Sequence, residues 1–119
     1  MEIYAVRIFV KQWPEACEFY GETLGLEARY RNDEIGWAEY SVGAPCLGIE
    51  RVQPGDAEGE ALVGRLVGIS LHVKDIAATY EDLKAKGVDF VSPPEEQFWG
   101  GKLAHFKDPD GNVLTLLGS

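Results

Sequence analysis

The stretch LVGISLHV, residues 66–73, marks the point at which the first half of the chain begins to repeat. Every second residue in it is apolar, which predicts a strand with one buried face. The stretch YAVRIFV, residues 4–10, shows the same alternation about 63 residues earlier. A repeat of this length indicates two copies of one structural unit. The order of helices and strands within each copy therefore determines the architecture.

Each strand precedes a predicted helix and three further predicted strands. Pro14 suits the first turn of a helix, and Gly25 ends the apolar helical pattern that comes after it. Asp75 is a good N-cap for the second helix, which Gly87 closes. The later strands are predicted at residues 27–31, 36–42 and 46–52 in the first half and at 88–91, 102–107 and 112–117 in the second.

These patterns predict an α+β fold of two tandem βαβββ modules in a single domain, residues 1–119. The first module spans residues 1–52 and the second spans 66–119, with a linker at 53–65 that is rich in acidic residues, glycine and proline. We expect the helix-bearing face of each module to be apolar and the opposite face to be mixed. The modules are predicted to form a curved mixed sheet around a cavity lined by the mixed faces, which is where a ligand would bind.

Composition narrows the class of partner. The chain has 119 residues, with 11 Lys+Arg against 20 Asp+Glu and a net charge of −9, which argues against nucleic acid and anionic membranes as partners. It has no apolar run of about 18 residues that would predict a membrane span. Cys17 and Cys46 are the only cysteines and lie far apart in sequence, so we predict a reduced, cytoplasmic protein.

Three short motifs carry a family resemblance. They are Phe19-Tyr20 with Leu24-Gly25 at the end of the first helix, Val73-Lys74-Asp75 before the second helix, and the turn at residues 108–112, DPDGN. In this order and on a repeated pattern, they resemble the vicinal oxygen chelate superfamily. That superfamily includes glyoxalase I, extradiol dioxygenases and bleomycin resistance proteins. The resemblance implies the βαβββ fold over nearly the whole chain and a homodimer, and it leaves the reaction open.

The resemblance also implies where a divalent metal would bind. The positions that correspond to the family's four metal ligands carry Ala5, Gly48, Gly68 and Thr115. Alanine and glycine have no ligating side chain, and a threonine hydroxyl is a poor ligand for such an ion. We therefore predict that the protein has no metal cofactor. A cavity without metal in this fold resembles the branch of the superfamily that sequesters antibiotics.

The prediction for function is a protein that binds an aromatic or cationic small molecule in the cavity. Aromatic rings stack on planar and cationic ligands, and carboxylates favour cations. The residues expected to bind the ligand lie on the mixed faces or in a loop at the cavity mouth, and they are Arg7, Phe9, Trp37, Glu39, Glu50, Ser70, His72, Trp99, His105 and Thr115.

The alternative is an enzyme of the same superfamily, a lyase or a dioxygenase. A displaced metal site would use residues of the mixed faces, namely Glu39, Glu50, His72 and His105. A metal-free mechanism would use His72 or His105 as a general base. No catalytic residue is assigned beyond these two histidines.

Overall fold

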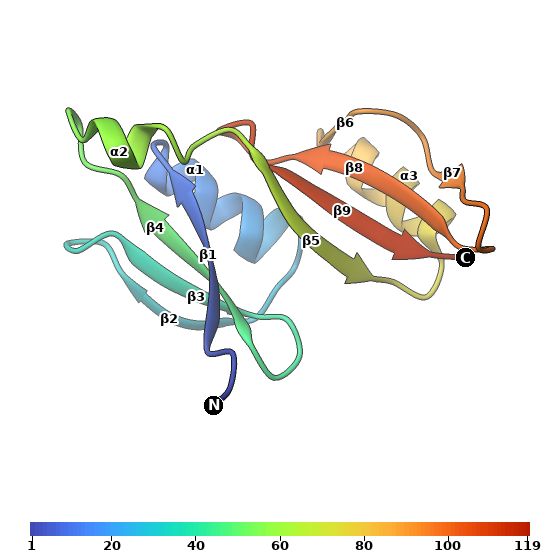
Figure 1. The fold of residues 1–119 in the computed structure, drawn as a ribbon, viewed down its shortest axis with the longest axis horizontal. Coiled ribbons are helices and arrows are strands. Elements are labelled where there is room, and N and C mark those ends of the chain that lie inside the picture. Colours follow the sequence, from blue (N-terminus) through green and yellow to red (C-terminus); the bar gives the residue numbers. More distant parts are fainter.

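The computed structural model describes all residues from Met1 to Ser119, and its elements occur in the predicted order (Figure 1). The first module contains β1 (Ala5–Val10), α1 (Trp13–Glu18), a π-helical turn η1 (Phe19–Thr23), β2 (Ala28–Asn32), β3 (Trp37–Ser41) and β4 (Cys46–Arg51). The second contains β5 (Leu66–His72), α3 (Ile76–Ala85), β6 (Asp89–Phe90), β7 (Glu95–Glu96), β8 (Lys102–Lys107) and β9 (Val113–Gly118). The linker carries one unpredicted short helix, α2 (Ala57–Glu60).

The strands form two mixed sheets, one in each module. Sheet A has the order β1-β4-β3-β2, and sheet B has the order β5-β9-β8-β6 with β7 paired to β8. β1 runs parallel to β4 and β5 runs parallel to β9, while the other pairs are antiparallel. The α+β fold of two βαβββ modules is thus confirmed. Its strands form two sheets rather than one curved sheet, because β1 and β5 are edge strands that do not pair with each other.

The first helix joins the modules through its aromatic end. Pro14 lies in the first turn of α1, as predicted, and the helix widens into η1, where the Leu24 amide donates to the Phe19 carbonyl at 2.8 Å. Phe19 and Tyr20 are both buried although they are consecutive. The Phe19 ring lies 6.3 Å from Phe106 in the second module. The Tyr20 ring packs toward Tyr40 of the first module, so one helix end supplies aromatic contacts to both halves of the core.

A hydrogen-bonded cluster of Tyr20, Asp108 and Asn112, here called the inter-module clasp, holds the modules together. The Tyr20 hydroxyl donates to Asp108 Oδ2 at 2.7 Å, and Asn112 Nδ2 donates to the Phe9 carbonyl at 2.9 Å. Asp108 also accepts hydrogen bonds from the backbone amides of Asp110 and Asn112. The DPDGN motif is therefore both a turn and a contact between modules.

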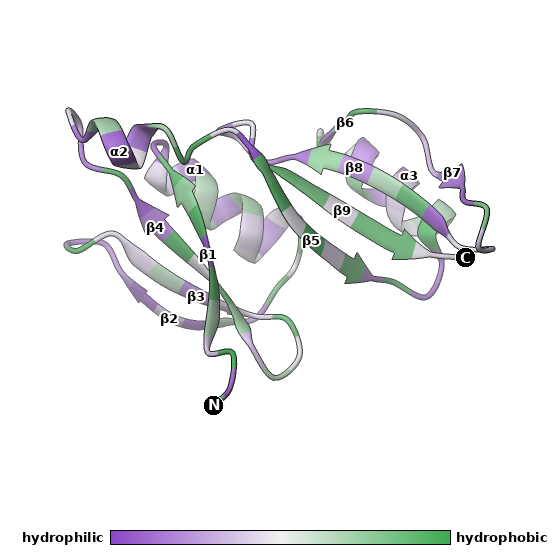
Figure 2. Cartoon of the chain, viewed as in Figure 1, coloured by the Kyte–Doolittle hydropathy of each residue, from purple (hydrophilic) through white to green (hydrophobic).

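The helix-bearing faces of the sheets build the shared core, and the opposite faces stay open. On β1, Ile8 and Val10 are buried under the helix while Arg7 is exposed. Figure 1 shows α1 and α3 on the same side of the strands. Figure 2 shows hydrophobic residues along β5 and β9 and hydrophilic ones on the outer strands β2 and β7. The predicted cavity between the mixed faces does not form within one chain, since the modules pack through their helix-bearing sides.

No helix of this structure has the length and apolar character needed to cross a membrane, and the longest, α3, has ten residues.

Candidate functional site

The open face of sheet A brings together five of the residues predicted to bind a ligand. Cross-strand pairing aligns them in two neighbouring rows, because partners in adjacent strands project from the same side of a sheet. One row contains Arg7, Gly48 and Glu39. The other contains Phe9, Glu50 and Trp37. The alternation of residues along each strand therefore correctly predicted that these five side chains share one face of the sheet.

The Trp37 indole lies against the backbone of β4 at Gly48. A Cβ atom placed on Gly48 would be 2.2 Å from Cη2 of Trp37, far inside van der Waals contact. Only glycine leaves room for the ring at this position. The indole is half-buried, so it presents an aromatic surface at the centre of the open face.

Glu39 is held beside the indole by two aromatic donors. Trp37 Nε1 donates to Glu39 Oε2 at 2.9 Å, and the Tyr4 hydroxyl donates to Glu39 Oε1 at 2.8 Å. The hydrogen bond from Trp37, together with the weaker effect of that from Tyr4, lowers the pKa of Glu39 from its ordinary value. The side chain is therefore a carboxylate at neutral pH, and it fixes the orientation of the indole.

Arg7 pairs within the same face. Its Nε lies 3.2 Å from Glu50 Oε1, and its guanidinium carbon lies 5.2 Å from the centroid of the Phe9 ring. These three residues line a small pocket of about 330 Å³ between sheet A and the segment around α2. Because Arg7 pairs with Glu50, Glu39 is the carboxylate of this face that has no ion pair, although it is buried and the positive charge of Arg29 also helps to lower its pKa.

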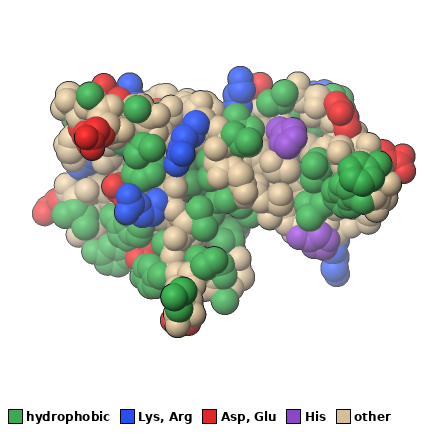
Figure 3. All heavy atoms as spheres, viewed as in Figure 1, with side chains coloured by type: hydrophobic (Ala, Val, Ile, Leu, Met, Phe, Trp, Pro, Cys, Tyr) green, Lys and Arg blue, Asp and Glu red, His purple; other side chains and the backbone are tan.

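The open face of sheet B carries a polar row. Ser70, Thr115 and His105 are cross-strand partners, and His105 Nδ1 lies 2.8 Å from Thr115 Oγ1. His72 lies on the same face two residues beyond Ser70, where it is exposed and pairs with Leu117. Figure 3 shows the two histidines on one side of the molecule. Neither imidazole is hydrogen-bonded to a carboxylate, so no partner polarises them.

Trp99 lies apart from these rows. It belongs to the loop between β7 and β8, at the end of the molecule opposite sheet A (Figure 1). Its ring packs on Gly101, where an added Cβ would lie 2.0 Å from Cζ3 of the indole. Trp99 is 52% exposed and its neighbour Phe98 is fully exposed. The two tryptophans predicted to bind ligand are therefore not brought together within one chain.

The residues at the family's metal positions do not fit a divalent ion. The Trp37 ring covers Gly48, and Gly68 has φ +82°, a conformation that strains any residue with a side chain. No group of three or more His, Cys, Asp or Glu side chains in the structure is placed to hold a metal. Glu39 and Glu50 lie on sheet A and the two histidines on sheet B, so the displaced site is not assembled within one chain.

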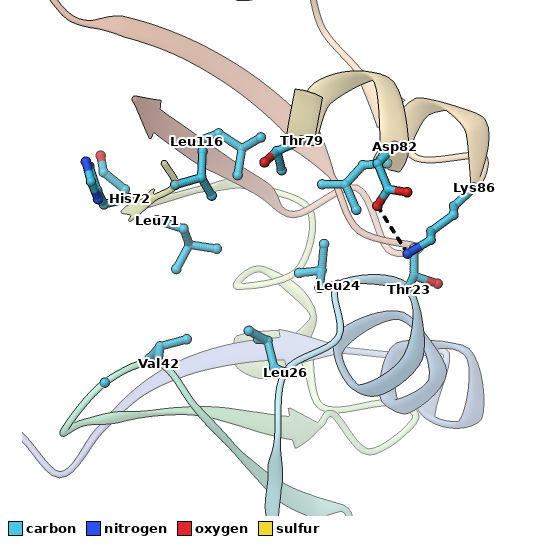
Figure 4. Close-up of a pocket in the computed structure, with 14 residues that line it drawn as sticks. Thr23, Leu24, Leu26, Val42, Leu71, His72, Thr79, Asp82, Lys86 and Leu116 are labelled. Carbon is cyan, nitrogen blue, oxygen red and sulfur yellow. Dashed lines mark ion pairs between the residues drawn. The ribbon is translucent and has the colours of Figure 1, made fainter. Parts of the chain in front are cut away.

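A larger pocket lies between the modules and was missed by sequence reasoning. It has a volume of about 630 Å³ and is here called the inter-module cleft (Figure 4). Of the residues predicted to bind ligand, only Ser70 and His72 line it. The signal in the sequence was Leu26, an apolar residue that follows the helix end at Leu24-Gly25 and precedes the strand predicted at residues 27–31.

A small α+β protein of two βαβββ modules with open, mixed faces defines a known class, and comparisons with known proteins agree. The chain belongs to the Glyoxalase/Bleomycin resistance protein/Dioxygenase superfamily, whose profile matches residues 3–116. It is 30% identical to the uncharacterized protein YraH of Bacillus subtilis (strain 168) over 129 residues, covering 98% of this chain and 97% of YraH.

Solved structures of the same fold agree with this assignment. A superfamily member from Sphaerobacter thermophilus DSM 20745 superposes with a TM-score of 0.86 at 28% identity, covering 100% of this chain and 98% of that one. TnmS3, an antibiotic binding protein from Streptomyces sp. CB03234, superposes with a TM-score of 0.80 at 26% identity, covering 99% and 95%. The structural neighbours of this chain thus include an antibiotic binding protein.

Proposed function

We propose that this protein binds a flat aromatic cation on the open face of sheet A and does so without a metal. The observation that carries the proposal is the Trp37 indole lying on Gly48 with its N–H held by Glu39. A tryptophan fixed in this way is a stacking surface already in place before the ligand arrives, so little conformational freedom is lost on binding. Similarity to the antibiotic binding protein TnmS3 supports a binding role.

The charge on this face favours a cation. Glu39 stays ionised between its two aromatic donors, and Arg7 is neutralised by Glu50. A cation above the indole gains from the electron-rich ring face and from the neighbouring carboxylate. A neutral aromatic ligand would gain affinity from stacking on the ring but none from the charge of Glu39.

The second part of the proposal is a homodimer. β1 and β5 are both edge strands, and a free edge of six or seven residues readily pairs with another chain. The polar row of Ser70, Thr115 and His105 would then contribute from the partner's sheet B to a site around Trp37. Light scattering should give about twice the 13.1 kDa of one chain. A mass of one chain at micromolar concentration would contradict this part.

Proflavine, a flat aromatic cation, is a suitable probe for the binding site. Removing the stacking surface with Trp37→Ala should weaken proflavine binding at least tenfold, a loss of about 1.4 kcal/mol. Glu39→Gln keeps an acceptor for the indole N–H but removes the charge, so it should weaken proflavine more than a neutral aromatic probe. Phe98→Ala removes an exposed aromatic ring far from sheet A and serves as the control. Calorimetry showing equal affinity for the wild type and Trp37→Ala would contradict the proposal.

The alternative, a lyase or dioxygenase, makes a different prediction for the same variants. Loss of His72 or His105 should abolish turnover of a 2-oxoaldehyde–thiol adduct in an enzyme, and Trp37→Ala should matter less. The observation in its favour is the hydrogen bond that orients His105 against Thr115. Elemental analysis of protein isolated without chelators distinguishes a metal-dependent enzyme from a metal-free one. A metal-dependent enzyme should retain about one metal ion per chain.

A further inference from the structure

We propose that the inter-module cleft is a second ligand site, which takes an uncharged and mainly apolar molecule. Within one chain the cleft lies apart from the Trp37 face, and its lining shares no residue with the open face of sheet A. Ser70 is the one residue that it shares with the polar row of sheet B. The proposal therefore does not depend on the function proposed above. Its volume of about 630 Å³ lies within the ~300–1,000 Å³ typical of small-molecule pockets.

The two walls of the cleft come from different modules. Figure 4 shows Leu24, Leu26 and Val42 on one side and Leu71 and Leu116 on the other, pointing into the space between them. The inter-module clasp and the contact between Phe19 and Phe106 hold these walls in place. The cleft is thus a consequence of fixed packing and not of a gap between loosely joined modules.

The apolar lining is only partly covered. Leu24, Leu26, Val42, Leu71 and Val73 pack against the core, yet each remains half-buried. Protein interiors are close-packed, and exposed apolar patches of this kind mark binding sites. Polar side chains at these positions would make a more soluble surface, so the apolar walls indicate an occupant.

The charges around the cleft indicate that the occupant is uncharged. Asp82 and Lys86 of α3 lie at one end and pair with each other at 3.2 Å between Oδ2 and Nζ. They are the only acidic and basic residues of the lining apart from His72, so the lining is neutral while the chain carries −9. A charged ligand would lose water without gaining a free partner. The hydroxyls of Thr23 and Thr79 offer hydrogen bonds to a polar group on a largely apolar body.

The shape of the cleft favours a small molecule over a second copy of this chain. A stable protein–protein interface buries about 800 Å² on each partner over a broad surface. The cleft is concave between two facing walls and admits only a few side chains. We therefore assign it to a small molecule and make the second copy an outcome of the test.

The probe for this site is 1-N-phenylnaphthylamine, which is uncharged and fluoresces when it leaves water. The full chain should bind one molecule with micromolar affinity. Thr79→Trp fills the cleft from α3 and should weaken binding at least tenfold, whereas Ala77→Trp adds the same ring to an exposed position of that helix and should not. If Thr79→Trp fails to fold, Val42→Lys is the second cleft variant, with the exposed Ile35→Lys as its control. Trp37→Ala should bind the probe as the wild type does.

Three results would overturn the proposal. One is unchanged affinity in both cleft variants. Another is loss of binding in Trp37→Ala, which would place the probe on sheet A. The third is an affinity for the probe that falls as the chain concentration is raised through the monomer–dimer transition, which would mean that a second copy fills the cleft. Failure of proflavine to depend on Trp37 would affect only the function proposed for sheet A.

Discussion

At the scale of single residues, the fit between Trp37 and Gly48 links packing to the proposed function. The indole occupies the volume that any side chain at position 48 would need. In the function proposed above, the same contact fixes the ring for stacking, and it covers a position that the family resemblance assigns to a metal ligand. The glycine at position 48 is therefore informative, because the Trp37 indole occupies the space that a side chain there would need.

This contact predicts a strong effect of the smallest possible substitution. Gly48→Ala adds one methyl group 2.2 Å from Cη2 of Trp37, so the ring must shift, and the shift disturbs its hydrogen bond to Glu39. Overpacking of this kind costs about 1–3 kcal/mol in the free energy of unfolding. Chemical denaturation would measure it, and proflavine affinity should fall in parallel.

The control for that substitution is the same change without the indole. In a Trp37→Ala background, Gly48→Ala should cost much less, because the clash is gone. A double-mutant cycle gives the difference as the coupling energy between the two positions. An equal cost in both backgrounds would show that the methyl group acts through something other than Trp37.

At the scale of elements, the N-caps Asp75 and Asp56 show that the same local signal can begin helices that contribute very differently to the core. Asp75 accepts a hydrogen bond from the Ala78 amide at 3.0 Å and begins the ten-residue helix α3. Asp56 accepts from the Gly59 amide at 3.1 Å and begins α2, which has four residues and buries none of them. Of these two helices, only α3 packs on a sheet.

We therefore predict that Asp75→Ala lowers the free energy of unfolding by about 1 kcal/mol, a typical effect of losing an N-cap. Asp56→Ala removes the same type of hydrogen bond and should have a smaller effect, since α2 adds little to the core. Thermal or urea unfolding of the two variants tests the difference. Equal losses would mean that the linker helix contributes to global stability.

The elements also show which parts of the fold were accessible from sequence. β8 was predicted at residues 102–107 and is observed there, because alternation is undisturbed between two turn signals. The two-residue strand β7 is too short to show a period, and η1 differs from an α-helix only in hydrogen bonding. Alternation likewise predicted which residues share an open face. The inter-module cleft was not predictable, since it depends on how the modules pack.

At the scale of the whole molecule, the inter-module clasp couples the fold to pH. Burial raises the pKa of Asp108, while hydrogen bonds from Asn112 and Tyr20 oppose that shift. An acid whose pKa is raised on folding favours the native state below its unfolded pKa, near 3.9. That contribution is lost as pH rises through the native pKa. The hydrogen bonds that Asp108 accepts therefore stabilise its ionised form in the folded protein against the cost of burial.

Removing the Tyr20 hydroxyl takes away one of these donors. In Tyr20→Phe the pKa of Asp108 should rise further, and the variant should lose about 1–3 kcal/mol, as expected when a buried acceptor loses its partner. The loss should grow between about pH 3.5 and pH 7, because the ionised carboxylate needs the donor most. Tyr40→Phe is the matched control, since the Tyr40 hydroxyl donates to the neutral carbonyl of Cys17 at 3.1 Å. Its cost should not change with pH over this range. Denaturant unfolding of both variants across the range measures the difference, and parallel curves would contradict the role assigned to Asp108.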